Sequence, residues 1–461
     1  MLYFIVWLLV LIASIYLFKK ASGSLSILKP NLNSIIFYYS FLISSYIGTL
    51  LIATGVDDYY MINRLTHEEY RWIGFYTVCF VMLVFPLMMF LVSKLVGFES
   101  DKEFNHYLQK DISLPFKGKN EFFLIFLGLS LISMAAIAYT FLKTPKIPIL
   151  EVVIGSGDLS PGELRNLAQR NFGGNVLIRN IFAIALTPLL SLIAYVYSVK
   201  TNQLKWKLLF LVLFAGAVAI NVYDLAKSPI FFYLIMFFLL RLYVGKMKFT
   251  VRKIVTWGIA GAVALIGMYI VIQGVTDVGS YLSYNSGPIG RLILAQIAPT
   301  FLHLNLFGEA LPFLMGRGLP STFIDLFDIE QVRSARLVMT TVFPEKVADG
   351  TAGVLNTLFI AEAYANFGFV GVVAGTIYVG VLVQVLYITF LRLPKNPIFL
   401  SLFIYFTVNI PRTLVGGFTD FLFNPIWTLL TGLFVGILLF IRFRIDLTSL
   451  WLKNKVRKVR S

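Results

Sequence analysis

The sequence predicts an all-α polytopic membrane protein, and three observations support this class. The chain of 461 residues is 58% hydrophobic and only 13% charged, with a mean hydropathy of +0.82. A soluble protein of this size usually has about twice that charged fraction. Apolar runs long enough to cross a bilayer, which takes about 20 helical residues, recur along the chain. Basic residues gather in alternate connectors between these runs, as membrane topology requires.

We expect a single integral membrane domain over residues 1–461 with eleven transmembrane helices. Each expected span is an apolar run that charged or Gly- and Pro-containing connectors delimit. The runs lie at 2–18, 33–53, 73–95, 120–142, 178–198, 207–225, 228–244, 254–275, 367–391, 397–414 and 421–441.

The distribution of charge predicts the orientation. The first run has no basic residue before it, Lys19 and Lys20 after it and no small-x-small cleavage site, so we expect an uncleaved span with its N-terminus outside. An odd number of spans then places residues 442–461 in the cytoplasm as a basic tail. With this orientation, 25 of the 39 basic residues lie in the shorter cytoplasmic connectors, whereas 17 of the 23 acidic residues lie outside. The bias therefore holds along the whole chain.

Two external regions are long enough to carry a functional site. Residues 143–177 are rich in Gly and Pro, which predicts irregular structure followed by a short helix near 162–171. Residues 274–367 form the longest loop, and loops of this length are uncommon unless they are functional. Its apolar stretches "GRLILAQIAPTFLHLNLF" and "GVLNTLFIAEAYANFG" are too short or too interrupted to span. We expect amphipathic or re-entrant helices there.

Composition excludes several other classes. The net charge of +16 follows the membrane topology, and no nucleic-acid-binding motif accompanies it. The single cysteine, Cys79, excludes a disulfide within the chain and a cysteine-based metal site. The three histidines are scattered, and the chain has neither a Gly-rich nucleotide loop nor an HExxH motif. We therefore expect no metal and no cofactor.

Asp224 and Lys227 are the only charged residues between Leu208 and Leu240. With Pro229 they stand where one span should end and the next begin, which predicts a tight external hairpin. One interpretation is a local ion pair at a helix start. The other is that Lys227 faces an anionic ligand near the lipid headgroups while Asp224 serves as a base, since ionisable groups at membrane depth are usually functional. Both interpretations stay open.

Beyond the short loop 54–72, eight arginines are expected on the external face, where the positive-inside rule depletes them. A guanidinium is permanently charged and matches phosphate oxygens with two parallel hydrogen bonds. Ordinary salt bridges are the competing interpretation, for which Asp325, Asp328 and Glu330 stand near two of the arginines. We predict that a pyrophosphate group is bound by residues from the set Arg291, Arg336, Arg412, Lys227, Arg333 and Arg179.

Four acidic residues on the same face could accept a proton: Asp224, Glu309, Glu362 and Asp420. Glu362 lies in "IAEAYANFGFVG", a short helix that leads into the next span, and a helix-capping role is its alternative interpretation. We select Glu362 and Asp224 as the catalytic candidates. Hydroxyl, amide and guanidinium groups suited to sugars are offered by Tyr364, Asn366, Arg165 and Arg170.

The layout of spans, the enlarged second external loop and three stretches together resemble the Wzy-type polymerases of O-antigen and capsule repeat units. These stretches are "YDLAKSPIFFYLIMFFLL", "GRLILAQIAPTF" and "FIAEAYANFGFVGVV". The arginine-x10-glycine elements of some members are absent. The resemblance implies a metal-independent, GT-C-like glycosyltransferase of the bacterial plasma (inner) membrane. It also implies undecaprenyl-pyrophosphate-linked oligosaccharides as substrates and a chain-length regulator as a further partner, in lipopolysaccharide or capsule synthesis.

Three other functions stay open at this stage. An O-antigen ligase-like transferase would share the layout but would use lipid A core as its acceptor. A flippase or secondary transporter for lipid-linked sugars would line a cavity in the middle of the membrane with charges. The sequence instead gathers its ionisable groups near the outer face, which favours an enzyme. A non-catalytic scaffold would leave the external arginines unexplained.

Overall fold

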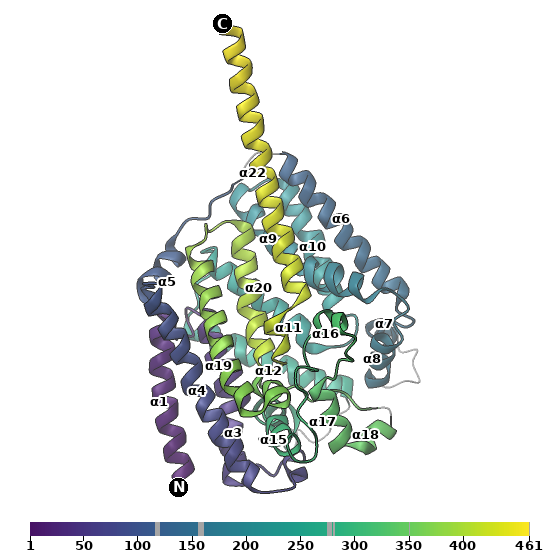
Figure 1. Ribbon diagram of the computed structural model, residues 1–461. Helices are drawn as coiled ribbons and strands as arrows, with labels where there is room; N and C mark the ends of the chain where they lie inside the picture. Colours follow the sequence, from purple (N-terminus) through teal and green to yellow (C-terminus); the bar gives the residue numbers. More distant parts are fainter. Residues whose placement is uncertain (116–119, 155–160, 274–278, 280–281, 350, 461) are drawn as a thin grey trace. The chain divides into compact units, whose positions relative to one another are not determined.

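The computed structural model describes the backbone of residues 1–115, 120–154, 161–273, 279, 282–349 and 351–460. Every regular element in these ranges is helical (Figure 1), because the apolar runs satisfy their backbone groups internally. The helices are α1 (Leu2–Ser22), α2 (Leu32–Ile35), η1 (Ile36–Tyr46), α3 (Ile47–Thr54), η2 (Ile62–Arg64), α4 (Glu69–Leu95), α5 (Ser100–Gln109), α6 (Asn120–Lys143), α7 (Pro148–Ile154), α8 (Pro161–Arg170), η3 (Ile178–Leu186), α9 (Thr187–Thr201), α10 (Leu204–Val222), α11 (Lys227–Tyr243), α12 (Val251–Gln273), α14 (Gly287–Ile293), α15 (Ala298–Leu306), α16 (Ser321–Ile324), η4 (Asp325–Phe327), α17 (Ser334–Val342), α18 (Pro344–Ala348), α19 (Ile360–Arg392), α20 (Pro397–Leu414), α21 (Thr419–Leu422) and α22 (Pro425–Arg460).

Nine helices in the described part of the chain are long and apolar enough to cross a membrane, which confirms the polytopic all-α class. The predicted spans 228–244 and 254–275 fall outside this set. Helices are nevertheless present there, since α11 has 17 residues and α12 covers Val251–Gln273. The total of eleven spans stays a prediction. The expected tail at 442–461 continues the last helix, whose backbone is helical as far as Arg460.

The chain forms two compact units. Unit 1 comprises Met1–Lys110, Gly245–Leu393 and Tyr405–Phe423. Unit 2 comprises Asp111–Val244, Pro394–Ile404 and Asn424–Ser461. The helix α20 therefore begins in unit 2 and ends in unit 1.

Unit 1 is built around α4, which packs against α1 on one side and against α19 on another (Figure 1). Three buried phenylalanines fill the core between the first helices. The ring centroid of Phe41 lies 4.9 Å from that of Phe85 and 5.9 Å from that of Phe18. Such offset and edge contacts stabilise aromatic pairs beyond their buried area. The core thus fixes the register of the helices whose connectors form the ends of unit 1.

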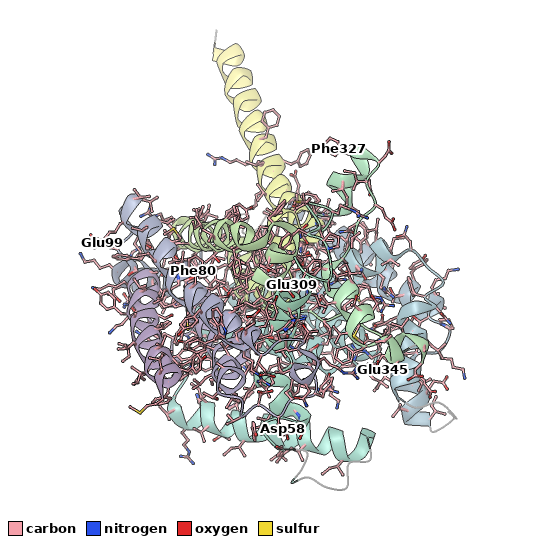
Figure 2. The ribbon with its side chains drawn as sticks, turned by 60° about the horizontal axis from the view of Figure 1, so that its bottom comes forward. Asp58, Phe80, Glu99, Glu309, Phe327 and Glu345 are labelled. Atoms are coloured by element: carbon pink, nitrogen blue, oxygen red, sulfur yellow. The ribbon has the colours of Figure 1, made fainter. Side chains whose placement is uncertain are left out.

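Unit 1 has two distinct ends. At one of them Arg392, at the end of α19, pairs with Glu103 of α5 at 2.8 Å. At the other, Arg64 pairs with Glu345 at 3.1 Å. This second end carries the N-terminus of the chain together with α17 and α18 (Figure 1), and we name it the N-terminal end. Figure 2 turns it toward the viewer, with Asp58, Glu309 and Glu345 labelled on it.

The helix α19 is kinked at Phe367 and Gly368, whose backbone angles are not helical. Its short first arm folds back against the long second arm. A Cβ atom at Gly371 would lie 2.1 Å from the backbone oxygen of Ala363, so only glycine allows this approach. The preceding residue, Phe359, packs on Phe85 in the middle of α4, with 6.2 Å between ring centroids. The first arm therefore starts within the helix bundle and is re-entrant.

The helices α14 and α15 also enter the bundle of unit 1. A Cβ atom at Gly48 of α3 would lie 2.1 Å from the backbone oxygen of Ile293, and one at Gly74 of α4 would lie 2.3 Å from the ring of Phe301. The stretch "GRLILAQIAPTFLHLNLF" thus forms two helices with a break between them. All nine residues of α15 are buried.

Unit 2 contains α6, η3, α9, α10 and α11 in mutual contact. Trp206 of α10 stacks on Tyr197 of α9, with 4.4 Å between ring centroids. The hairpin expected around Asp224 and Lys227 is confirmed, because α10 ends at Val222 and α11 begins at Lys227. The short helix expected near 162–171 is also present, as α8.

Candidate functional site

Glu362, on the first arm of α19, holds the start of the short helix α21. Its Oε2 atom accepts hydrogen bonds from the backbone amides of Phe418 and Thr419, at 2.5 and 3.0 Å. The hydroxyl of Thr419 lies 3.3 Å from both carboxylate oxygens. These contacts are those of a helix-capping carboxylate, which accepts the otherwise unpaired amides of a first turn. The competing interpretation of Glu362 as a cap therefore has direct geometric support.

Asp420 and Arg333 complete a group of charges around this cap. Asp420 follows Thr419 on α21 and is exposed, and Arg333 precedes α17 and is also exposed. The charge of Arg333 acts on both Glu362 and Asp420, and the charge of Asp420 acts on Glu362. Three segments distant in sequence thus bring one base and two acids together. We name Arg333, Glu362 and Asp420 the charged triad.

The charged triad does not lie at the level of the kink of α19. It lies beside the second arm of that helix, further along the chain from the kink. The hydroxyl of Tyr378 donates to the backbone oxygen of Phe421 at 3.0 Å. Tyr378 follows Gly368 by ten residues, which is about 15 Å along a helix. The start of α21 therefore lies within the length of the span formed by the second arm. Irregular backbone at such a depth occurs where protein covers it or where it lines an aqueous cavity.

The segment 351–359 positions the arginines of this region. Nη2 of Arg333 donates to the side chain of Asn356 at 3.2 Å. Nη1 of Arg336 donates to the backbone oxygens of Ala352 and Gly353, at 2.7 and 2.8 Å. One nitrogen of Arg336 is therefore committed to holding the segment. Neither arginine forms an ion pair with Asp325, Asp328 or Glu330 among the described residues.

Tyr364 and Asn366, the predicted sugar-binding residues of this region, are buried. The hydroxyl of Tyr364 donates to the backbone oxygen of Phe307 at 3.3 Å. The side chain of Asn366 accepts from the amide of Gly318 at 3.0 Å and donates to the backbone oxygen of Glu362 at 2.8 Å. Their polar groups therefore hold the fold together, and their assignment to sugar binding stays a prediction.

Arg412 lies close to the end of α20, yet it stands deep in unit 1. The backbone oxygen of Pro411 accepts a hydrogen bond of 2.7 Å from Ser40, within the first half of the span Leu32–Thr54. Nη1 of Arg412 donates to Asn409 at 3.1 Å, and the phenols of Tyr39 and Tyr405 are its electrostatic neighbours. The sequence predicts that this arginine lies at the outer end of a span. In the structure, the end of α20 lies beside the inner part of the neighbouring span, Leu32–Thr54.

Arg291 lines a pocket of about 420 Å³ at the N-terminal end of unit 1. The other walls are Tyr59, Tyr60, Asn285, Ser286, Gly287, Ala295 and Gln296. The phenol groups of Tyr59 and Tyr60 are hydrogen-bonded to each other, and burial raises the pKa of both. Both therefore stay protonated, and one of the two hydroxyl hydrogens is used in the bond between them. In the described part of the chain, no carboxylate forms an ion pair with Arg291.

Unit 2 gathers the other predicted residues at its α10–α11 hairpin. The carboxylate of Asp224 accepts from Gln169 at 3.1 Å and from the amide of Ala226 at 3.0 Å. The guanidinium of Arg179 lies 4.4 Å from the ring centroid of Phe172 and donates to Asn180 at 3.2 Å. Lys227 begins α11 and is part-buried, and Arg165 of α8 is exposed. The side chain of Arg170 lies outside the described residues.

The adjacent acids Asp57 and Asp58 have separate roles in unit 1. Asp57 is buried and pairs with Arg71 at 2.6 Å, and it also accepts from the amide of Tyr59 at 3.2 Å. Asp58 uses its backbone oxygen to accept from Asn285 at 3.1 Å. Among the described residues no group of three or more His, Cys, Asp and Glu side chains is arranged to hold a metal ion.

Sequence reasoning missed the walls of the pocket and underrated Asp420. Tyr59 and Tyr60 follow the two acids in the motif "DDYY", a short connector between two spans, which was the available signal. Gln296 stands in an apolar stretch and gave no signal. Asp420 was one of four acids on the expected external face, but only the fold shows that it shares a site with Glu362 and Arg333.

No protein-family model, no curated protein and no solved structure matches the chain. The chemistry that the chain can perform is therefore inferred from the geometry of the charged triad and of the pocket.

Proposed function

We propose that the chain is a GT-C-like polysaccharide polymerase of the bacterial plasma membrane. It transfers a growing glycan from undecaprenyl pyrophosphate onto a new lipid-linked oligosaccharide repeat unit at the outer face. The observation that supports this reaction best is the convergence of Arg333, Glu362 and Asp420 beside a re-entrant helix. Glycosyl transfer from a pyrophosphate needs an acid–base group and a cation in one place, and the charged triad offers both.

Each member of the charged triad has a distinct task in this proposal. A hydroxyl oxygen of the acceptor attacks the anomeric carbon of the donor glycan, and the bond from that carbon to the pyrophosphate oxygen breaks. The carboxylate of Asp420 takes the hydroxyl proton. Arg333 stabilises the negative charge that develops on the departing undecaprenyl pyrophosphate. Glu362 is a positioning residue, because its oxygens already accept from α21.

The surface at the kink of α19 suits a prenyl carrier. Phe367, Phe369 and Val370 are exposed at the kink of α19, at 41%, 53% and 76%. Exposed side chains of this kind on a spanning helix contact lipid chains. A carrier whose prenyl chain lies along this face would present its pyrophosphate near the re-entrant arm.

The test is polymerisation by purified protein. Wild type is mixed with undecaprenyl-pyrophosphate-linked repeat units in detergent, with EDTA in one arm and Mg²⁺ in another, and the products are separated on a gel. We expect a ladder in both arms. Asp420→Asn and Arg333→Gln should lose it while keeping the wild-type Tm. The matched control is Arg317→Gln, an exposed arginine of the same loop whose side chain has no assigned task.

Each other outcome counts against a specific part of the proposal. A ladder that survives in both variants would remove the charged triad from the reaction. Absence of any ladder, with a single glycan joined to lipid A core instead, would indicate the ligase-like alternative. A ladder that needs Mg²⁺ would contradict a metal-independent transfer.

A flippase of lipid-linked sugars is a second candidate, because of Arg412. Charged side chains within a span are costly and often line a substrate path. Arg412, with Asn409, Tyr39 and Tyr405 around it, is such a side chain. Proteoliposomes that carry a fluorescent lipid-linked saccharide would test this function. Transbilayer movement that Arg412→Gln abolishes, together with no ladder from wild type, would favour the flippase.

A further inference from the structure

The pocket of Arg291 has the size and composition of a small-molecule site. Its volume of about 420 Å³ falls in the range of ligand pockets, which is about 300–1,000 Å³. It is separate from the charged triad but joined to it by two neighbouring residues. Thr357 donates from its hydroxyl to the backbone oxygen of Gln296 at 2.7 Å, and Asn356 accepts from Arg333 at 3.2 Å.

Tyr60 offers an aromatic surface in this pocket. It is 48% exposed, although burial is normal for so large a ring. Its ring is held from three directions. The centroid of Tyr60 lies 4.9 Å from that of Tyr59 and 5.9 Å from that of Phe343, and the ammonium of Lys346 lies 5.1 Å away. A fixed ring beside polar groups can stack against the C–H face of a sugar.

The polar groups of the pocket differ in their availability. Asn285 is occupied, because it donates to the backbone of Asp58 at 3.1 Å and accepts from Ser283 at 2.7 Å. The side-chain amide of Gln296 has no hydrogen-bond partner among the described residues, and Arg291 is exposed without an ion pair there. One amide and one guanidinium therefore remain for a ligand.

The charge of the pocket distinguishes between two anionic ligands. A pyrophosphate carries at least two negative charges and is usually held by several cations. Arg291 is the only cationic residue among the described walls of the pocket, and the ammonium of Lys346, 5.1 Å from the ring centroid of Tyr60, lies outside these walls. A single guanidinium matches a single carboxylate, with two parallel hydrogen bonds. A stacking ring and a free amide beside it match the hydroxyls and C–H face of a sugar that carries the carboxylate.

We propose that this pocket binds an acidic sugar residue of the uronic acid class, with its carboxylate on Arg291, its ring on Tyr60 and a hydroxyl on Gln296. The proposal rests on the proposed function for the source of the sugar, which is the repeat unit of the acceptor. It assigns Arg291 to binding of the glycan, in place of the pyrophosphate binding predicted from the sequence. The repeat unit that this chain handles would then contain a uronic acid.

Direct binding tests this proposal without any turnover. Saturation-transfer NMR on the purified protein in detergent would compare soluble glucuronate, glucose and inorganic phosphate as probes. We expect glucuronate to bind with an affinity at least about tenfold above that of glucose, since a bidentate charged pair adds at least about 1.4 kcal/mol. Arg291→Gln should remove this preference. The matched control Arg64→Gln, an arginine at the same end and outside the walls of the pocket, should keep it.

Two further variants separate the ring from its hydroxyl. Tyr60→Ala should weaken glucuronate binding about tenfold or more, whereas Tyr60→Phe, which keeps the ring, should stay within about threefold of wild type. Equal binding of glucose and glucuronate would overturn the proposal. Binding of phosphate that depends on Arg291, without glucuronate binding, would overturn it as well and return Arg291 to phosphate recognition. Since no ladder is measured, a failure here is distinct from a failure of the polymerase.

Discussion

The backbone amide of Thr419 donates a hydrogen bond of 3.0 Å to Oε2 of Glu362, across 57 residues of sequence. This contact ties the re-entrant arm of α19 to the helix that carries Asp420. A carboxylate that caps a helix is a poor candidate for a free base, because its Oε2 atom already accepts two amide hydrogen bonds. In the proposed reaction this contact makes Glu362 a positioning residue and leaves proton transfer to Asp420.

Replacing Glu362 by Gln should lower the free energy of unfolding by about 1–3 kcal/mol, because hydrogen bonds to a charged acceptor are lost. The measurement is denaturant or thermal unfolding of the purified protein in detergent. Glu330→Gln is the control, since that side chain is exposed. Equal stability of the two variants would contradict the capping role.

Gly417→Ala should destabilise the same contact. A Cβ atom there would lie 2.7 Å from Oε2 of Glu362, and this oxygen cannot move without breaking its hydrogen bonds. Gly432→Ala, where the new Cβ meets open space, should leave Tm within about 1 °C of wild type. Combining Gly417→Ala with Glu362→Ala should cost less than the two single changes together. Strict additivity would show that the two sites are independent.

His303 predicts a loss of stability in acid. It is buried in α15 and its ring contacts the backbone oxygen of Pro299 at 2.7 Å. Burial lowers its pKa from 6.5 to about 4, so the folded protein keeps it neutral where the unfolded chain protonates it. Its contribution is full above about pH 6.5 and is lost as the pH falls toward 4. The measurement is Tm between pH 7 and pH 4 for wild type and for His303→Gln. As the pH falls, the Tm of wild type should decrease more steeply than the Tm of the variant, even if the two proteins differ in Tm at pH 7. Parallel curves would rule out this titration.

Arg71→Gln should be strongly destabilising, by about 3–5 kcal/mol, because it leaves the buried carboxylate of Asp57 without its partner. Asp57→Asn introduced into the same chain should restore a large part of this loss. Arg64→Gln, which removes an exposed ion pair, should cost less than about 1 kcal/mol. Unfolding of all four proteins in denaturant gives the comparison, and similar losses from Arg71→Gln and Arg64→Gln would contradict the buried pair.

The orientation can be tested with cysteines placed at the two ends of unit 1. Glu345→Cys lies at the N-terminal end and Lys102→Cys at the other, and both positions are exposed. In right-side-out vesicles a membrane-impermeant maleimide should label Glu345→Cys at once and Lys102→Cys only after permeabilisation. The native Cys79 is buried and should stay unlabelled. The reverse pattern would invert the predicted topology.

Much of the helical layout could be predicted because each span satisfies its backbone groups by itself. Apolar length and flanking charge are local properties, and they placed the hairpin between α10 and α11 within a few residues. The break between α14 and α15 was not predicted, because the stretch is apolar on both sides of it. The break is set by tertiary contacts, in which α14 packs on Gly48 of α3 and α15 packs on Gly74 of α4.

The sequence by itself determined the class of the protein, its strong positive-inside bias and the residue types available at one face. Only the tertiary structure decided which of them meet. Whether Glu362 is a base or a cap depends on Thr419, and the depth of Arg412 depends on where Pro411 meets Ser40. Both contacts join residues far apart in sequence. Such contacts cannot be predicted from hydropathy and local charge, because the contacts arise from the packing of side chains between helices.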